Sequence, residues 1–192
     1  EELVTLKSET STTFVHVTHD QEEACAIADR IAVMNRGRIV QVDAPIALYR
    51  APRTSFVAEF IDVGTVFRGD VVRSWDVATL ETRDVRVSGP IPATLTGVGR
   101  LALVLPHDRL RIAPAAGGTS SGSSTMGVVE RTVFAGSAFN VFVRLGSGLE
   151  IRASVPENAI LGVGAGTEVE LSWSPEDVIV VERGEDEGST FH

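Results

Sequence analysis

The residue best suited to chemistry in this sequence is His19, which follows a short apolar run and precedes acidic residues. Residues 12–18 are rich in β-branched and aromatic side chains and carry no carboxylate, lysine or arginine, which predicts a strand covered on both faces. A helix is expected to start at once after it. Ligands of α/β proteins bind at the carboxyl ends of strands, at such strand-to-helix turns. An imidazole placed there could reach a phosphate or a reacting water.

The helix after His19 has a clear start signal. Asp20 is the expected N-cap, and Glu23 completes a capping-box pattern three residues later. One apolar face then follows at helical spacing: Ala24, Ile27, Ala28 and Ile31. Asp20, Glu22 and Glu23 could instead form a metal or acid–base cluster, but their spacing favours capping of a solvated first turn. These carboxylates would repel a phosphate from the helix N-terminus, so any phosphate contact is expected from His19 itself.

The remaining candidates for chemistry have simpler explanations. Cys25, the only cysteine, is expected to be a small packed residue, and it excludes an intramolecular disulfide. His16 is expected to pack on its strand. His107 and Asp108 could suggest a catalytic pair, but neighbouring strand residues point to opposite faces, and Asp108 fits a turn. The two tryptophans are expected in core or edge packing: Trp75 and Trp173.

Residues 1–61 have the pattern of an α/β segment. Leu3 and Leu6 lie at helical spacing, and residues 31–42 read as a hairpin that turns at Asn35-Arg36-Gly37. Pro45 suits the first turn of another helix. Residues 54–61 predict a further short helix, whose inward side chains are expected to be Phe56, Val57, Phe60 and Ile61.

The pattern changes to β after Asp62. Residues 62–181 contain short runs of period-two alternation separated by turn residues, which is typical of an antiparallel barrel or sandwich. Residues 114–125 lack apolar periodicity and predict a flexible loop. A weak repeat relates residues 103–112 to residues 171–180, each being a strand, a turn and a second strand. Residues 182–192 form an acidic tail that is expected to be solvated.

Bulk composition excludes several classes of partner. The chain has 192 residues and a formal net charge of −9, which argues against a nucleic-acid footprint and against adsorption to an anionic membrane. No apolar run approaches the roughly 20 residues that span a bilayer, so no direct membrane insertion is expected. The chain starts at Glu1 without a methionine, and we expect it to be a fragment of a longer protein.

The run Val17-Thr18-His19-Asp20-Gln21-Glu22-Glu23-Ala24, together with residues 28–41, closely resembles the switch-histidine region of ABC-transporter ATPase subunits. Residues 44–61 resemble the exit from that domain in importers with a C-terminal β extension. Residues 171–178 (Leu-Ser-Trp-Ser-Pro-Glu-Asp-Val) resemble the end of this extension, the TOBE domain with its OB-like fold. Two stretches, 21–24 and 171–177, look more like polyamine, iron or phosphonate importers than sugar importers.

The resemblance implies an α/β segment at the end of a P-loop-type ATPase domain (residues 1–61), followed by an all-β OB-like barrel domain (residues 62–181). It implies that His19 contacts the γ-phosphate of ATP and helps to position the attacking water. The parent protein would use ATP and magnesium, form a homodimer and work with integral membrane permease subunits. It would lie in the cytoplasm, peripheral to the inner face of the cell membrane.

The chain lacks the other parts of an ATP site. A P-loop needs Gly-x-x-x-x-Gly-Lys-Ser/Thr, and the only lysine, Lys7, has no such glycines around it. The family's Ser-Gly-Gly signature run and its magnesium-holding acidic strand are also missing, and they precede this region in the family. We therefore expect the chain alone to be inactive, with no bound ATP or metal.

Two further expectations follow. The β region could instead be a stand-alone OB-like module for small-ligand binding or dimerisation, without ATPase chemistry. Residues 1 to about 30 are expected to pair with another copy or to be held abnormally, because a buried unpaired backbone group costs roughly 1–3 kcal/mol.

Overall fold

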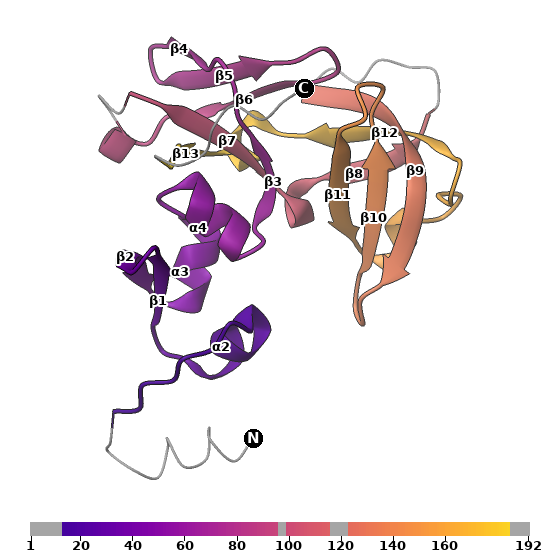
Figure 1. Cartoon of the computed structure of the whole chain (residues 1–192). Helices are drawn as coiled ribbons and strands as arrows, with labels where there is room; N and C mark the ends of the chain where they lie inside the picture. The colour runs from indigo at the N-terminus through magenta and orange to yellow at the C-terminus, as the bar shows by residue number, and fades with distance from the viewer. Residues whose placement is uncertain (1–12, 96–98, 116–122, 185–192) are drawn as a thin grey trace. The chain divides into compact units, whose positions relative to one another are not determined.

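The computed structural model of the chain describes residues 13–95, 99–115 and 123–184, and the helix expected near Leu3 and Leu6 lies outside them. The chain forms two compact units, Glu1–Pro52 and Arg53–His192. Figure 1 shows that the second unit is built mainly from strands and that the few helices are short. No helix in the described ranges has the length and apolar composition that crossing a bilayer would require.

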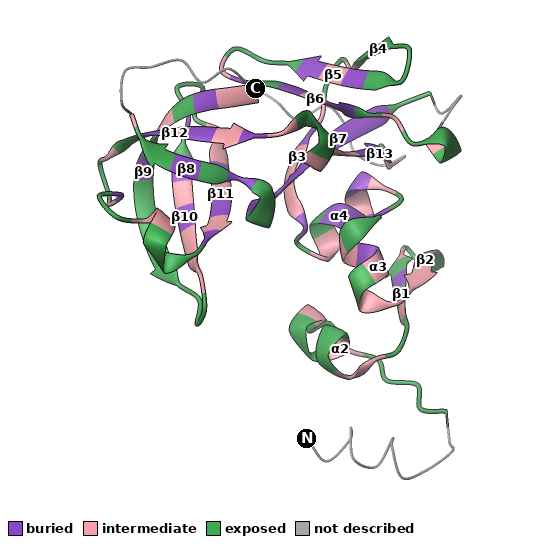
Figure 2. Ribbon diagram, turned by 180° about the vertical axis from the view of Figure 1, so that it is seen from behind, coloured by how far each residue is buried: buried purple, intermediate pink, exposed green. Residues whose placement is uncertain are grey.

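The segment before His19 is exposed in the first unit. Residues 13–18 belong to no strand among those described, and Val15 and Val17 are 88% and 91% exposed. Figure 2 shows this segment mostly in the colour of exposed residues. The expectation of a strand buried on both faces is therefore wrong for this chain. A strand is buried only when neighbouring strands pair with it, and the described residues of this unit supply no such neighbour.

Helix α2 (Gln21–Ile27) is shorter than its apolar spacing indicated. Ala28 already has extended backbone angles (φ −86°, ψ 140°), and Ile31 starts strand β1 (Ile31–Asn35). The expected helical face thus ends at Ile27. None of the residues of α2 is buried, so no packing extends the helix beyond its cap.

The expected hairpin is confirmed. Strand β1 pairs antiparallel with β2 (Arg38–Asp43), and Asn35 lies opposite Arg38. The two turn residues have positive φ angles, 49° at Arg36 and 75° at Gly37, as a two-residue hairpin turn requires. Helix α3 (Pro45–Arg50) follows with proline in its first turn. The buried side chain of Gln41 donates to the Ala51 carbonyl and ties the hairpin to the end of α3.

The second unit starts with helix α4 (Ser55–Phe60). The Thr54 hydroxyl caps it by accepting from the Val57 N–H at 3.3 Å. We expected this helix to belong to the α/β segment, but it packs on strands β3 (Gly64–Phe67) and β7 (Leu101–Pro106) of the β unit. Of its expected inward residues Val57 is buried, whereas Phe56, Phe60 and Ile61 are half-buried.

The other strands of this unit are antiparallel. They are β4 (Val72–Ser74), β5 (Val77–Glu81), β6 (Arg86–Pro90), β8 (Arg111–Pro114), β9 (Ser123–Phe134), β10 (Phe139–Arg144), β11 (Glu150–Val155), β12 (Glu168–Trp173) and β13 (Ile179–Glu182). Short 3-10 helices separate some of them: η1 (Ala93–Leu95), η2 (His107–Arg109), η3 (Glu157–Ala159) and η4 (Pro175–Asp177). The strands form three sheets, ordered β11-β10-β9-β12-β8, β13-β7-β3 and β4-β5-β6. Strands β8 and β11, the two edges of the five-stranded sheet, also contact each other, which curls this sheet toward a barrel.

The order of elements in the first half of the unit recurs in the second half. Six elements of the first half correspond in order to six of the second half. They are β5, β6, η1, β7, η2 and β8 in the first half, and β10, β11, η3, β12, η4 and β13 in the second. The single long strand β9 replaces β3 and β4, since it pairs with both β12 and β10. The weak repeat between residues 103–112 and 171–180 is thus confirmed as part of a larger duplication.

The two halves exchange their last strands. Strand β8 of the first half pairs with β12 of the second, and β13 of the second half pairs with β7 of the first. The register is equivalent in both pairs: Leu103 lies opposite Val180, and Leu171 lies opposite Ile112. The first residue of each repeat therefore pairs with the tenth residue of the other. Neither half completes its own sheet.

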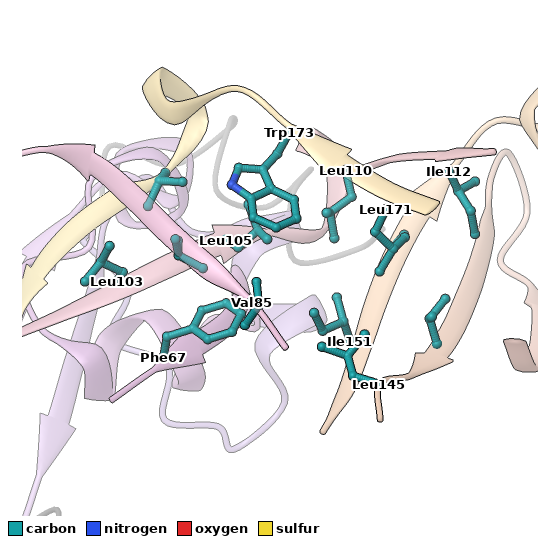
Figure 3. Packing of buried hydrophobic residues seen from close by; sticks show 14 of the residues in the cluster. Phe67, Val85, Leu103, Leu105, Leu110, Ile112, Leu145, Ile151, Leu171 and Trp173 are labelled. Atoms are coloured by element: carbon teal, nitrogen blue, oxygen red, sulfur yellow. The ribbon is translucent and has the colours of Figure 1, made fainter. Parts of the chain in front are cut away.

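One hydrophobic core serves both halves. Figure 3 shows part of this cluster, including Phe67, Leu103, Leu171 and Trp173, and the cluster also contains Leu80 and Val87 of the β4-β5-β6 sheet. The bounds expected for the flexible loop, residues 114–125, are too wide at both ends. Pro114 belongs to β8, residues 123–125 belong to β9 and pair with β12, and the remaining residues, apart from Ala115, lie outside the described ranges. The tail likewise begins later than expected, because Glu182 is still in β13.

Candidate functional site

The turn that holds His19 is fixed by hydrogen bonds of its neighbours. The Asp20 side chain accepts from the Glu23 N–H at 2.9 Å, which confirms it as the N-cap of α2. The reciprocal half of the capping box does not form. The Asp20 N–H donates instead to the Thr18 hydroxyl at 3.0 Å, and that hydroxyl donates to the Glu23 carboxylate at 2.9 Å.

Glu23 also faces His16, whose Nε2 lies 3.3 Å from a carboxylate oxygen. The Thr18 hydroxyl, and then His16, lower the pKa of Glu23 below its ordinary value. His16 is exposed and contacts the helix start, so the expectation that it packs on a strand is wrong. The three carboxylates of this turn are not a metal cluster, and no group of three metal-ligating side chains occurs elsewhere among the described residues.

His19 itself is exposed, and none of the described residues forms a hydrogen bond with its side chain. The turn therefore presents an imidazole to solvent, which is the geometry of a residue available for an external contact. Cys25 is exposed as well, contrary to the packed position that we expected. Cys25 is exposed because none of the residues of α2 is buried in this unit.

The described residues alone do not fit ATP. A nucleotide site needs several donors and cations around the phosphates, and the turn offers one imidazole flanked by Asp20, Glu22 and Glu23. These carboxylates repel phosphate oxygens. The turn thus offers at most one donor, the imidazole of His19, to a phosphate.

A second polar cluster lies in the β unit, where His107 meets Asp62 and Arg152. His107 is buried in η2, its Nδ1 lies 2.8 Å from the Arg152 carbonyl oxygen of β11, and its Nε2 lies 3.4 Å from the Asp62 carboxylate. The Arg152 guanidinium also pairs with Asp62. His107 therefore does not act with Asp108, whose side chain faces Arg109. No local sequence pattern indicated this cluster, because its members come from three separate segments.

The two tryptophans differ in environment. Trp173 is 3% exposed in the core, as expected, and its indole N–H has no hydrogen-bond partner among the described residues. Trp75 is fully exposed at the turn between β4 and β5, so its expected packing role is wrong. Its φ angle of 54° places it in a tight turn, where the side chain projects away from the sheet.

Comparison with known proteins identifies the β unit first. Residues 106–181, from the end of β7 into β13, match the family model of the TOBE domain. The chain therefore carries a TOBE domain. A solved structure of the cytoplasmic molybdate-binding protein ModG covers 62% of this chain and 90% of its own, with a TM-score of 0.49 and 15% identity.

Curated relatives then cover almost the whole chain. The spermidine/putrescine import ATP-binding protein PotA of Treponema pallidum is 35% identical over 198 residues, which are 94% of this chain and 52% of the relative. PotA of Acidothermus cellulolyticus is 36% identical over 91% of this chain and 46% of its own length. PotA of a Nostoc species is 51% identical over 70 residues, 36% of this chain and 18% of its own length. The chain spans about half the length of the first two of these relatives. It belongs with the C-terminal part of ABC-importer ATP-binding subunits that carry a TOBE domain.

Proposed function

We propose that this chain is the C-terminal portion of the ATP-hydrolysing subunit of an ABC importer. The observation that carries the proposal is the match to import ATP-binding proteins over more than nine-tenths of the chain, which includes the turn around His19. In this proposal residues 1–61 end the ATPase domain, and residues 62–181 form a regulatory and dimerising β domain.

His19 supplies an imidazole contact to the terminal phosphate of ATP and helps to position the attacking water. Phosphoryl transfer depends mainly on positioning and on charge stabilisation, so one well-placed donor contributes strongly. The exposed position of His19 and its lack of a described hydrogen-bond partner support this role. ATP and magnesium are bound by groups that this chain does not contain, so the chain alone is inactive.

The transported substrate is proposed to be a polyamine, since the relatives named above are spermidine/putrescine importers. A second copy of the subunit and integral membrane permease subunits are the proposed partners. The subunit would then lie in the cytoplasm against the inner face of the cell membrane.

The test uses the full reading frame that contains this chain. Replacement His19→Ala is expected to lower the rate of ATP hydrolysis by about 10²–10³-fold, the range measured when one preorganised donor is lost, while ATP still binds. His16→Ala is the matched control, because His16 precedes the turn and its ring faces Glu23. Equal losses in both variants would contradict the role of His19.

A titration of the isolated chain with ATP tests the second part of the proposal. We expect no binding in the micromolar range, because only one phosphate contact is present. Micromolar affinity would overturn this expectation. A reading frame that has no P-loop would favour the alternative, a stand-alone module that binds a small ligand or dimerises.

A further inference from the structure

The duplication creates two equivalent junctions between the halves of the β unit. At one junction η2 of the first half packs on β11 of the second half, and at the other η4 of the second half packs on β6 of the first half. The exchanged strands repeat this relation, because β8 contacts β11 and β13 contacts β6. At each junction, a 3-10 helix and the last strand of one half contact one strand of the other half. These contacted strands, β11 and β6, occupy equivalent positions in the two halves.

The two junctions differ in chemistry at one position. Helix η2 begins with His107, whereas η4 begins at the equivalent position with Pro175. His107 is buried and contacts the other half through the Arg152 carbonyl oxygen. Proline cannot titrate, so only the first junction contains an ionisable group at this point.

The proton position on neutral His107 follows from its contacts. A carbonyl oxygen only accepts, so Nδ1, at 2.8 Å from the Arg152 oxygen, carries the hydrogen. Nε2 of the neutral ring then presents a lone pair to an oxygen of Asp62 at 3.4 Å. These two acceptors do not attract each other until a proton lies between them. At neutral pH Asp62 is therefore held by the Arg152 guanidinium and not by His107.

The surroundings of His107 oppose that extra proton. Burial, and then the Arg152 guanidinium, lower the pKa of His107 below its ordinary value, and Asp62 offsets only part of this effect. The charged groups that face the ring are Arg152 from β11 and Asp62 from the turn between α4 and β3. On its own helix, Asp108 and Arg109 face each other, and Arg109 also faces Asp177.

We propose that His107 is a proton switch at one of the two junctions between the halves of the β unit. The neutral ring closes the junction between η2 and β11. Protonation places a second cation beside Arg152 in a buried site, and this cost exceeds the added attraction of Asp62, so η2 loosens from β11. The equivalent junction at Pro175 does not respond. The switch concerns the β unit alone and does not depend on the ATPase assignment.

The sign of the pH effect is set by the direction of the pKa. Because the pKa of His107 is lower in the folded chain than in the unfolded chain, the unfolded chain binds more protons below about pH 6.5. The junction is thus fully stable above that pH, and it weakens as the pH falls toward the folded pKa. One pH unit below 6.5 the loss is at most about tenfold in the closing equilibrium.

Hydrogen exchange measures this loss with an internal reference. The His107 N–H donates to the Val63 carbonyl at 3.2 Å, and the Val178 N–H donates within η4 to the Pro175 carbonyl at 3.2 Å. Between pH 6.5 and pH 5.5, the protection of the His107 amide relative to Val178 should fall by up to about tenfold. In His107→Gln, whose amide still donates to Arg152 but does not titrate, the ratio should stay constant.

An NMR titration of the histidine rings gives an independent measurement on the unmodified chain. His107 should titrate below pH 6.5, and Asp62→Asn should lower its pKa further because the offsetting charge is lost. A His107 pKa at or above 6.5 would overturn the proposal even if the Gln variant failed to fold. A constant exchange ratio in the unmodified chain, or an unchanged pH response in His107→Gln, would overturn it as well.

Discussion

Truncation of two equivalent core leucines tests whether the halves of the β unit fold as one. Leu103 and Leu171 are fully buried, and each lies opposite a residue of the other half, Val180 and Ile112 respectively. We expect Leu103→Ala and Leu171→Ala each to lower the free energy of unfolding by about 3–5 kcal/mol, the sum of lost burial and the cavity that remains. For a unit of this size, the melting temperature should fall by roughly 10 °C or more.

The decisive observation is the number of transitions. Because β13 completes the sheet of the first half and β8 completes that of the second, both variants should still unfold in a single step. Urea unfolding is followed by far-UV circular dichroism, which reports both halves, and by the fluorescence of buried Trp173, which lies in β12. The two signals should share one lowered midpoint in each variant. Exposed Trp75 is replaced by Phe in all samples, so that the fluorescence comes from Trp173 alone.

The matched control is Val72→Ala on the edge strand β4. Val72 is 66% exposed, so this substitution should change the free energy of unfolding by no more than about 0.5 kcal/mol. If Leu103→Ala lost part of the dichroism early while the Trp173 signal kept its original midpoint, the halves would be independent. That result would refute the interlocking inferred from the strand exchange.

Two other predictions concern a close backbone approach and a surface carboxylate. A Cβ atom at Gly64 would clash with the Leu105 carbonyl group, so Gly64→Ala should lower the free energy of unfolding by about 1–3 kcal/mol in a thermal melt. A Cβ atom at Gly99 would meet no atom within 4 Å, so Gly99→Ala should lower it by less than about 1 kcal/mol. Hydrogen bonds from Ser147 lower the pKa of Asp84 below its ordinary value of 3.8. The ionised carboxylate therefore stabilises the folded chain above that pH, and this stabilisation is lost as the pH falls through the pKa of the folded state. The stability difference between the unmodified chain and Asp84→Asn should therefore shrink below about pH 4, and a difference that grows there would contradict this sign.

The local signals in the sequence predicted most elements that depend on neighbouring residues. The hairpin around Gly37, the cap at Asp20 and the helix that starts at Pro45 all formed where turn and cap residues indicated. The period-two pattern located β12, whose side chains alternate between buried and more exposed positions, and the apolar run of β7 located a strand that is buried at all six positions. These features need only the chemistry of a few adjacent residues.

Features that depend on distant segments could not be predicted in the same way. Residues 12–18 have the composition of a buried strand, but composition does not supply pairing partners, and the described part of the segment is exposed. The exchange of β8 and β13 needs the pairing register, which a repeat of ten residues does not reveal. The contact of His107 with Asp62 and Arg152 joins residues that are remote in the sequence, so no local pattern indicated it.

The exchange of last strands also has a consequence for synthesis and for truncated products. A growing chain makes β7 long before β13, so the first half waits with an open sheet edge until almost the last described residues have been made. A stop codon just before residue 179 would leave the five-stranded sheet with all its strands, yet it would strip β7 of a partner in the half that was made first. Loss of β13 would therefore expose aggregation-prone backbone in β7, a strand that is made much earlier.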